Sequence, residues 1–197
     1  MKRIGTYAGT FDPVHSGHIG FALQALQAAW LDEVYFMPER LPRGKDGITH
    51  YGHRVGMLRQ ALKPYPNLHV LDLPDRRFTV GGTMPRLVNR FPEDQLCLLV
   101  GSDVIKNLGQ WPKVDQLLEQ CELIIGLRAG QQKLEVFEML EALPLFPPMV
   151  TLVDSRAPHL TSRVIREALR YNRPVRGLLA SVWRYAHAQW LYVSLSE

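Results

Sequence analysis

The chain has 197 residues, a length typical of one domain and sufficient to bury a substantial core. Its hydrophobic content of 46% is ordinary for a globular protein, and no apolar run reaches the ~18 residues that a membrane-spanning helix needs. The net charge of +4 indicates an anionic partner only mildly. The basic residues are scattered as far as Arg156, and from Arg156 to Arg184 arginines recur with few acids, which indicates either a solvated basic face or a phosphate site. We expect neither a nucleic-acid nor a membrane partner.

Two further features concern the cellular compartment. Cys97 and Cys121 both lie in apolar runs, which favours buried free thiols over a disulfide, and two cysteines this far apart make no zinc box. The N-terminal residues MKRIGTYAG lead directly into a strand pattern, with no apolar segment typical of a signal peptide. We therefore expect a cytoplasmic protein.

Apolar, β-rich runs recur along the chain in the order RIGTYAG, EVYFMP, LHVLDL, QLCLLVG, CELIIGLR and MVTLVD. Segments with helical spacing, such as 21–30 and 80–91, lie between them. Strands that are apolar nearly throughout are typical of a parallel sheet covered on both faces, and this alternation predicts a right-handed, doubly wound α/β fold. From Thr161 onward the pattern is mainly helical, with a short WLYVSL tail. We predict a single domain, 1–197, whose C-terminal part, 155–197, is a mainly helical subdomain.

The stretch GTYAGTFDPVHSGH joins the first predicted strand to the first predicted helix. In a doubly wound fold the ligand lies at such a junction, near the point where the strand order reverses. Gly9 lets the backbone approach a ligand closely, and Thr10 and Phe11 offer amides there. The free N–H groups of the following helix start favour an anion, and His15 and His18 add donors to the same space. These parts predict a phosphate-binding site.

This site matches neither of the two common phosphate-binding motifs. The sequence has no GxxxxGK[ST], and no GxGxxG opens a helix here. A metal site at His15 and His18 lacks a third ligand at a supporting spacing, so we predict no metal-binding residue. A histidine at a helix start is more often a cap or a packed residue, but the Gly-Thr-Phe-Asp-Pro frame favours a functional role.

The frame resembles the signature of the nucleotidyltransferase superfamily, which is a Gly, then Phe-Asp-Pro, then His-x-Gly-His. Further segments resemble, in order, those of the nicotinate/nicotinamide mononucleotide adenylyltransferase family: FMPERLPRGK, HRVGMLRQAL, RRFTVGGTMPRL, LVGSDVIKNLGQW, GLRAG and HLTSRVIR. The resemblance covers nearly the whole chain. It implies a mostly parallel, Rossmann-like sheet of the nucleotidyltransferase type. It also implies an enzyme of NAD biosynthesis that transfers the adenylyl group of ATP to nicotinate or nicotinamide mononucleotide and releases pyrophosphate.

The same resemblance implies roles for particular residues. The catalytic residues are His15, His18, Lys45 and Arg166. The ATP-binding residues are Gly9, Thr10, Phe11, His15, His18, Gly101, Asp103, Arg128, Ser162, Arg163 and Arg166. The mononucleotide-binding residues are Lys45, Thr79, Thr83, Asp103 and Trp111, with Phe78, Thr79 and Thr83 placed on the family's Tyr-Thr-x-Asp-Thr segment.

The implied mechanism needs no covalent enzyme intermediate. A phosphate oxygen of the acceptor attacks the α-phosphorus of ATP, and pyrophosphate leaves in line. His18 would lie closest to the α-phosphate, and Lys45, Arg163 and Arg166 would hold the β- and γ-phosphates. Mg²⁺ is expected with ATP, bridging phosphate oxygens and taking few protein ligands.

Several implied roles have a structural alternative. Lys45 could be a solvated loop lysine, Asp103 a helix N-cap and Trp111 a core residue. The remaining histidines are interpreted as structural: His50, His53, His69 and His187.

The chain also departs from the family pattern. Arg163 stands where the family has a small hydroxyl residue, and Gly81 stands where it often has Asp. These departures leave open the choice between nicotinate and nicotinamide mononucleotide, and the effect of Arg163 on nucleotide or acceptor choice. The oligomeric state, including a homo-oligomer, is also open. The alternatives are a nucleotidyltransferase with a different phosphorylated acceptor and a non-catalytic nucleotide sensor.

Overall fold

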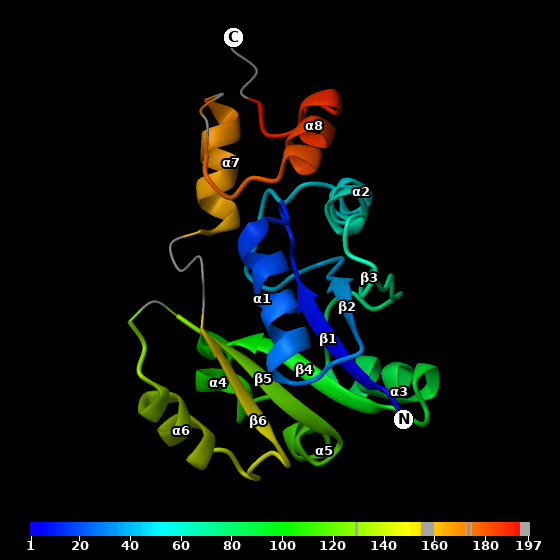
Figure 1. The fold of residues 1–197 in the computed structure, drawn as a ribbon, viewed down its shortest axis with the longest axis vertical. Helices are drawn as coiled ribbons and strands as arrows, with labels where there is room; N and C mark the ends of the chain where they lie inside the picture. The colour runs from blue at the N-terminus through cyan, green and yellow to red at the C-terminus, as the bar shows by residue number, and fades with distance from the viewer. Residues whose placement is uncertain (129, 155–159, 172, 174, 194–197) are drawn as a thin grey trace.

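The computed structural model describes residues 1–128, 130–154, 160–171, 173 and 175–193 (Figure 1). Its centre is a six-stranded sheet in the order β3-β2-β1-β4-β5-β6, in which every neighbouring pair is parallel. The strands are β1 (Arg3–Gly9), β2 (Glu33–Pro38), β3 (Leu68–Val70), β4 (Gln95–Gly101), β5 (Cys121–Leu127) and β6 (Val150–Asp154). The order reverses between β1 and β4, so the predicted doubly wound α/β fold is confirmed.

Helices cover both faces of this sheet. They are α1 (Ser16–Ala28), α2 (Tyr51–Leu62), α3 (Val80–Arg90), α4 (Ser102–Leu108), α5 (Val114–Gln120), α6 (Lys133–Glu141), α7 (Ser162–Arg170) and α8 (Ala180–Ala188). Figure 1 shows α1 across the front of the sheet, with α7 and α8 at the top. Within the described residues, no helix is long and apolar enough to cross a bilayer.

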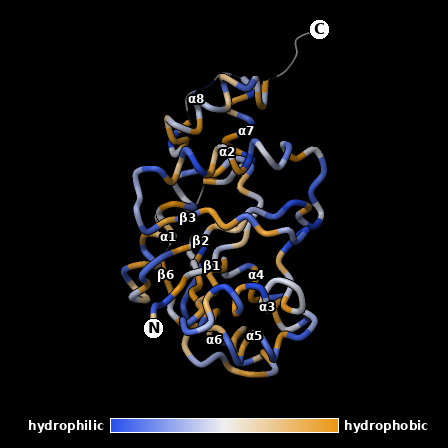
Figure 2. Tube along the Cα trace, turned by 90° about the vertical axis from the view of Figure 1, so that its right-hand side faces the viewer, coloured by the Kyte–Doolittle hydropathy of each residue, from blue (hydrophilic) through white to orange (hydrophobic). Residues whose placement is uncertain are grey.

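Two hydrophobic clusters lie on opposite faces of the sheet. One buries residues of α3, α4, α5 and α6, and the other buries residues of α1, α2 and α8. Figure 2 shows hydrophobic residues along the central strands. Successive strand residues point to opposite faces, so Leu98 belongs to the first cluster and Leu99 to the second. This is why the strands are apolar nearly throughout.

The two cysteines follow the same division. Cys121 lies in the first cluster and Cys97 in the second, and both are buried free thiols, as predicted. Burial raises the pKa of each thiol to about 12, because the apolar surroundings disfavour the thiolate. Both side chains therefore act as small hydrophobic residues of the core.

The third strand is shorter than its apolar run predicts. The sequence favoured a strand through LHVLDL, but only Leu68–Val70 pairs with β2. β3 is an edge strand, so it has a single neighbour to continue the ladder. Beyond it, the Asp72 carboxylate accepts hydrogen bonds from Arg40, at 2.7 Å, and from the Tyr51 hydroxyl, at 2.6 Å. Arg40 Nε also donates to the Leu73 carbonyl at 3.0 Å, so the chain after β3 contacts the Arg40 and Tyr51 side chains instead of continuing the strand.

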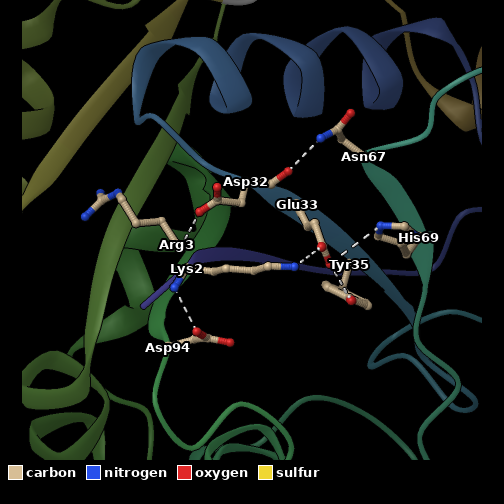
Figure 3. Close-up of polar contacts among 8 residues, drawn as sticks. All are labelled: Lys2, Arg3, Asp32, Glu33, Tyr35, Asn67, His69 and Asp94. Carbon is tan, nitrogen blue, oxygen red and sulfur yellow. Dashed lines mark hydrogen bonds and ion pairs between the residues drawn. The ribbon is translucent and has the colours of Figure 1, made fainter.

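The amino-terminal edge of the sheet, where the strands begin, is held by paired charges (Figure 3). Lys2 Nζ donates to Glu33 at 2.7 Å, and the Lys2 backbone N–H donates to Asp94 at 2.8 Å. The Arg3 backbone N–H donates to Asp32 at 2.7 Å. Charges at this edge are therefore neutralised within the protein.

Candidate active site

A cavity of about 700 Å³ opens at the carboxyl-terminal edge of the sheet, beside the reversal between β1 and β4. Its walls come from the loop after β1, the start of α1, the β4–α4 turn, the end of β5 and the start of α7. It brings together Lys45 and every predicted ATP-binding residue: Gly9, Thr10, Phe11, His15, His18, Gly101, Asp103, Arg128, Ser162, Arg163 and Arg166. We call it the ATP cavity.

The loop after β1 is shaped by Gly9 and Phe11. Phe11 has a left-handed backbone, with φ of 50°, and its ring is buried beneath the loop. A Cβ on residue 9 would lie 2.9 Å from that ring, so the close approach requires glycine. The Phe11 ring packs edge-on against Tyr7, at 5.4 Å between centroids, and against His18, at 5.1 Å. This aromatic packing fixes the position of the His18 ring.

The two histidines lie against each other at the start of α1. Their ring centroids are 3.7 Å apart, and His18 Nδ1 accepts a hydrogen bond from the His15 backbone N–H at 3.2 Å. His15 is buried, and its Nδ1 has no hydrogen-bond partner among the residues that the structure describes. A buried, unpaired ring nitrogen beside this cavity favours a ligand as its partner.

Both imidazoles are neutral near neutral pH. Burial lowers the pKa of His15 from 6.5 to about 4. Burial also lowers the pKa of His18, and the nearby His15 and Lys45 lower it further. A neutral imidazole carries one N–H, and His18 Nδ1 is an acceptor, so its proton lies on Nε2. His18 therefore offers a directed N–H donor.

A buried arginine that the sequence analysis missed orders the loop that carries Lys45. The Arg54 side chain is fully buried and donates to three carbonyl oxygens. The acceptors are Thr10 at 2.6 Å, Thr49 at 2.9 Å and Arg40 at 3.2 Å. Lys45 Nζ, on the same loop, donates to the Thr10 hydroxyl at 2.7 Å. Arg54 thus joins the loop to the end of β1.

The Asp-Pro pair of the signature holds distant segments together. Asp12 is buried, and its carboxylate accepts from the Tyr192 hydroxyl at 2.6 Å and from the Thr49 N–H at 3.1 Å. Its carbonyl accepts from Arg166 Nη1 at 2.6 Å. The Ser162 hydroxyl donates to the Pro13 carbonyl at 2.9 Å, so its proton is engaged within the protein. The start of α7 is therefore fastened to the signature loop.

The β4–α4 turn holds an ion pair at the rim. Asp103 and Arg128 are 2.8 Å apart, and both side chains are more than half exposed, at 55% and 57%. A Cβ on residue 101 would collide with the Asp103 carboxylate in its present position, so glycine leaves room for the ion pair. The pair joins the start of α4 to the end of β5 at the wall of the ATP cavity.

A second cavity of about 480 Å³ adjoins the first, and Thr10 and Lys45 line both. Its walls include Phe78, Thr79 and Trp111, and the Phe78 and Trp111 ring centroids are 5.9 Å apart. Both rings are partly exposed and also pack against the core, so the structural and functional interpretations of Trp111 are compatible. We call this space the acceptor cavity.

Two predicted mononucleotide-binding residues lie elsewhere. Thr83 is buried and outside both cavities, where its hydroxyl accepts from the Thr79 N–H at 3.1 Å. If the Tyr-Thr-x-Asp-Thr segment begins at Phe78, its fifth residue is Gly82 and not Thr83. Gly82 lines the acceptor cavity. Asp103 lines the ATP cavity but does not line the acceptor cavity.

The acceptor cavity also contains charged residues that carried no signal in the sequence. Glu39 accepts a hydrogen bond from the Phe78 N–H at 3.0 Å, and Arg43 and Lys113 line the same walls. Isolated charges in loops are usually solvated, so only the folded chain brings them together. Arg54 was missed for a related reason, because an arginine on a helix is usually at the surface.

The comparisons with known proteins agree with this geometry. A family model described as Cytidylyltransferase-like matches residues 6–168. The chain is 34% identical over 203 residues to the nicotinate-nucleotide adenylyltransferase of Bacillus subtilis, covering 98% of this chain and 100% of that protein. It is 33% identical over 199 residues to the probable nicotinate-nucleotide adenylyltransferase of Desulfitobacterium hafniense, covering 97% of this chain and 96% of that one.

A solved structure shows the same fold. The nicotinic acid mononucleotide adenylyltransferase of Plasmodium falciparum, complexed with NaAD, aligns with a TM-score of 0.80 and 18% identity over 98% of each chain. The family model spans most of this chain, and the B. subtilis relative aligns with nearly all of it. The predicted family and the predicted enzyme class, a nucleotidyltransferase, are therefore confirmed. The chain belongs to the Cytidylyltransferase-like family and, within it, to the nicotinate-nucleotide adenylyltransferases.

Proposed function

We propose that this protein transfers the adenylyl group of ATP to nicotinate mononucleotide and releases pyrophosphate. The observation that carries this proposal is the pair of adjoining cavities with a common boundary at Thr10 and Lys45. One cavity is lined by histidines and arginines and suits a triphosphate. The other presents two aromatic rings and suits a flat heterocycle. Two phosphorylated substrates can meet at the boundary.

The choice of acceptor is supported by the relatives. The B. subtilis and D. hafniense proteins are named for nicotinate nucleotide, and the P. falciparum structure contains NaAD. In this chain, the acceptor cavity has three cationic side chains, Arg43, Lys45 and Lys113, against one acidic side chain, Glu39. This balance suits a phosphorylated ligand with a second negative charge.

His18 is proposed to act on the α-phosphate. His18 lines the ATP cavity, and its Nδ1 is held by the His15 N–H, which leaves the Nε2–H as the donor for a ligand. As the acceptor oxygen attacks, charge on the equatorial phosphate oxygens is stabilised by preorganised donors of this kind. Because the nucleophile is already an anion, no side chain has to remove a proton from it.

Lys45 is proposed to hold the reacting phosphates at the boundary. Its ammonium, bonded to the Thr10 hydroxyl, can contact both the α-phosphate and the acceptor phosphate and reduce their mutual repulsion. Arg166 is oriented by the Asp12 carbonyl, and with Arg163 it lines the wall for the β- and γ-phosphates. These cations favour departure of the pyrophosphate.

Magnesium is proposed to arrive as the ATP complex. Mg²⁺ keeps several waters and prefers phosphate oxygens with few protein ligands. Within the described ranges, no group of three or more His, Cys, Asp or Glu side chains could hold a metal ion. Asp46 and Asp103 line the ATP cavity and can accept hydrogen bonds from metal-bound water.

We also propose a cytoplasmic location. The two cysteines are free thiols, which is typical of a reducing compartment. Fractionation of the source cells tests this independently of activity.

The reaction is tested by following pyrophosphate release from Mg-ATP with nicotinate or nicotinamide mononucleotide. We expect turnover with nicotinate mononucleotide. A folded protein that binds ATP but uses neither acceptor would overturn the proposed function and favour a nucleotide sensor. Turnover with neither pyridine mononucleotide but with another phosphorylated acceptor would favour a different transferase.

A further inference from the structure

Lys113 lines the acceptor cavity and not the ATP cavity. We infer that its ammonium binds the carboxylate on the acceptor's pyridine ring and thereby selects nicotinate over nicotinamide. This inference rests on the proposed function. It assigns a specificity role to a residue that no sequence motif indicated.

The position of Lys113 follows from the order of the substrate groups. The acceptor phosphate must reach the α-phosphate, so it lies at the Thr10–Lys45 boundary. The ring must then lie deeper in the acceptor cavity, against Trp111. Lys113 lines this cavity and not the ATP cavity, only two residues along the chain from Trp111. A charge there meets the ring substituent rather than the phosphate.

The side chain of Lys113 depends on the glycine at position 81. A Cβ at Gly81 would lie 3.5 Å from Cδ, 3.6 Å from Cε and 3.6 Å from Nζ of Lys113. The lysine therefore runs along the bare start of α3. An aspartate at 81 would carry its carboxylate into reach of that ammonium and neutralise it. With glycine there, and among the described residues, Lys113 belongs to no ion pair.

The backbone of Lys113 gives an independent indication. Lys113 has φ of 63° and ψ of 29°, a left-handed conformation that a lysine adopts at some cost. The turn is closed by the Val114 N–H, which donates to the Trp111 carbonyl at 3.1 Å. Asparagine or glycine would fit this turn with less strain. The turn therefore holds the Lys113 backbone close to Trp111.

Glu39 makes the selection sharper. It is the acidic residue of the acceptor cavity, and its Oε1 already accepts from the Phe78 N–H. Without Lys113, a ligand carboxylate would meet this negative charge, whereas a carboxamide could donate to it. With Lys113, a charge-assisted hydrogen bond favours the carboxylate by about ten- to a hundredfold.

The test compares kcat/KM for nicotinate and nicotinamide mononucleotide in the wild type and three variants. Lys113→Gln should lower the nicotinate value by about ten- to a hundredfold. It should leave the nicotinamide value and the KM for ATP nearly unchanged. Lys113→Arg should retain most of the preference, because the charge remains. Gly81→Asp should lose the preference with Lys113 in place. Lys133→Gln, on the exposed start of α6, is the control and should match the wild type.

The possible failures are distinguishable. A wild type that uses neither acceptor would overturn the proposed function and this inference with it. A wild type that uses both equally would overturn the inference alone. So would an equal loss for both acceptors in Lys113→Gln, provided that its melting temperature matches the wild type. If Lys113→Gln does not fold, Gly81→Asp decides: an unchanged preference would overturn the inference.

Discussion

The two edges of the sheet use their cationic side chains in different ways. At the amino-terminal edge, Arg3 forms two hydrogen bonds with the Glu122 carboxylate, at 3.0 and 2.5 Å, and Lys2 contacts Glu33. Each positive charge there has a carboxylate partner. Figure 3 shows the Lys2 side chain pointing toward Glu33.

At the carboxyl-terminal edge, the cations contact neutral oxygens instead. Lys45 donates to a hydroxyl and Arg166 to a carbonyl, and within the described residues neither has a carboxylate within 4.0 Å. Arg128, paired with Asp103 at the rim, is the exception. Charge that the protein does not neutralise remains available for an anion. We therefore propose that the first edge serves stability and that the second serves ligand binding.

The largest expected effect is on turnover, at His18. His18→Ala removes a preorganised donor to the α-phosphate, so kcat should fall by roughly 10²–10³. It also removes the acceptor of the His15 N–H, which should cost only about 1 kcal/mol of unfolding free energy. Steady-state kinetics and urea denaturation on one preparation measure both.

The matched control is a histidine at the other edge. His69 Nε2 lies 3.6 Å from the Glu33 carboxylate. His69 belongs to the edge strand β3 and does not line the ATP cavity. His69→Ala should leave kcat unchanged. A His18→Ala enzyme with normal turnover would contradict the role assigned to the carboxyl-terminal edge.

The next effect concerns ATP affinity, at Arg163. This exposed residue lines the ATP cavity where the family has a small hydroxyl residue. If it binds the triphosphate, Arg163→Ala should raise the KM for ATP about ten- to a hundredfold and leave the acceptor KM nearly unchanged. Arg170→Ala, at the exposed end of the same helix, should change neither. Unchanged ATP kinetics in Arg163→Ala would remove Arg163 from the site.

The amino-terminal edge should show the opposite behaviour. Arg3→Met leaves the mostly buried Glu122 without its partner, so the unfolding free energy should fall by about 1–3 kcal/mol while kcat/KM stays constant. Lys2→Met breaks an exposed pair and should cost less than about 1 kcal/mol. Chemical denaturation and the pyrophosphate assay separate the two quantities. Loss of activity in folded Arg3→Met would show that the edges are not independent.

Much of this comparison could be predicted from the sequence. Apolar runs predicted each strand, because strands buried on both faces need apolar side chains at every position. The signature motif predicted which residues gather after β1, because its glycine and helix start have a local physical function. β3 was overestimated, since this edge strand has a single neighbour and the backbone beyond it is contacted by the Arg40 side chain instead.

The rest depended on contacts between distant segments. Arg54 reaches three carbonyls that are 5, 14 and 44 residues away along the chain. No local pattern indicates such a residue. Thr83 was assigned by resemblance and lies buried beside Thr79, because a shift of one helical residue moves a side chain by about 100°. Lys113 became a candidate only when folding placed it against Gly81.

A further expected effect is a pH dependence of stability that arises at the carboxyl-terminal edge. His15 has a pKa of about 4 in the folded chain against an ordinary 6.5, because burial disfavours its charged form. Between these values the unfolded chain binds more protons, so this contribution is fully present above pH 6.5 and is lost as the pH falls toward 4. From pH 7 to pH 5 the loss at His15 should be about 2 kcal/mol. His15→Gln cannot take up this proton, so its unfolding free energy should fall less steeply over that range. Urea denaturation of both proteins at pH 7, 6 and 5 measures the difference, and equal slopes would show that His15 is not held neutral by burial.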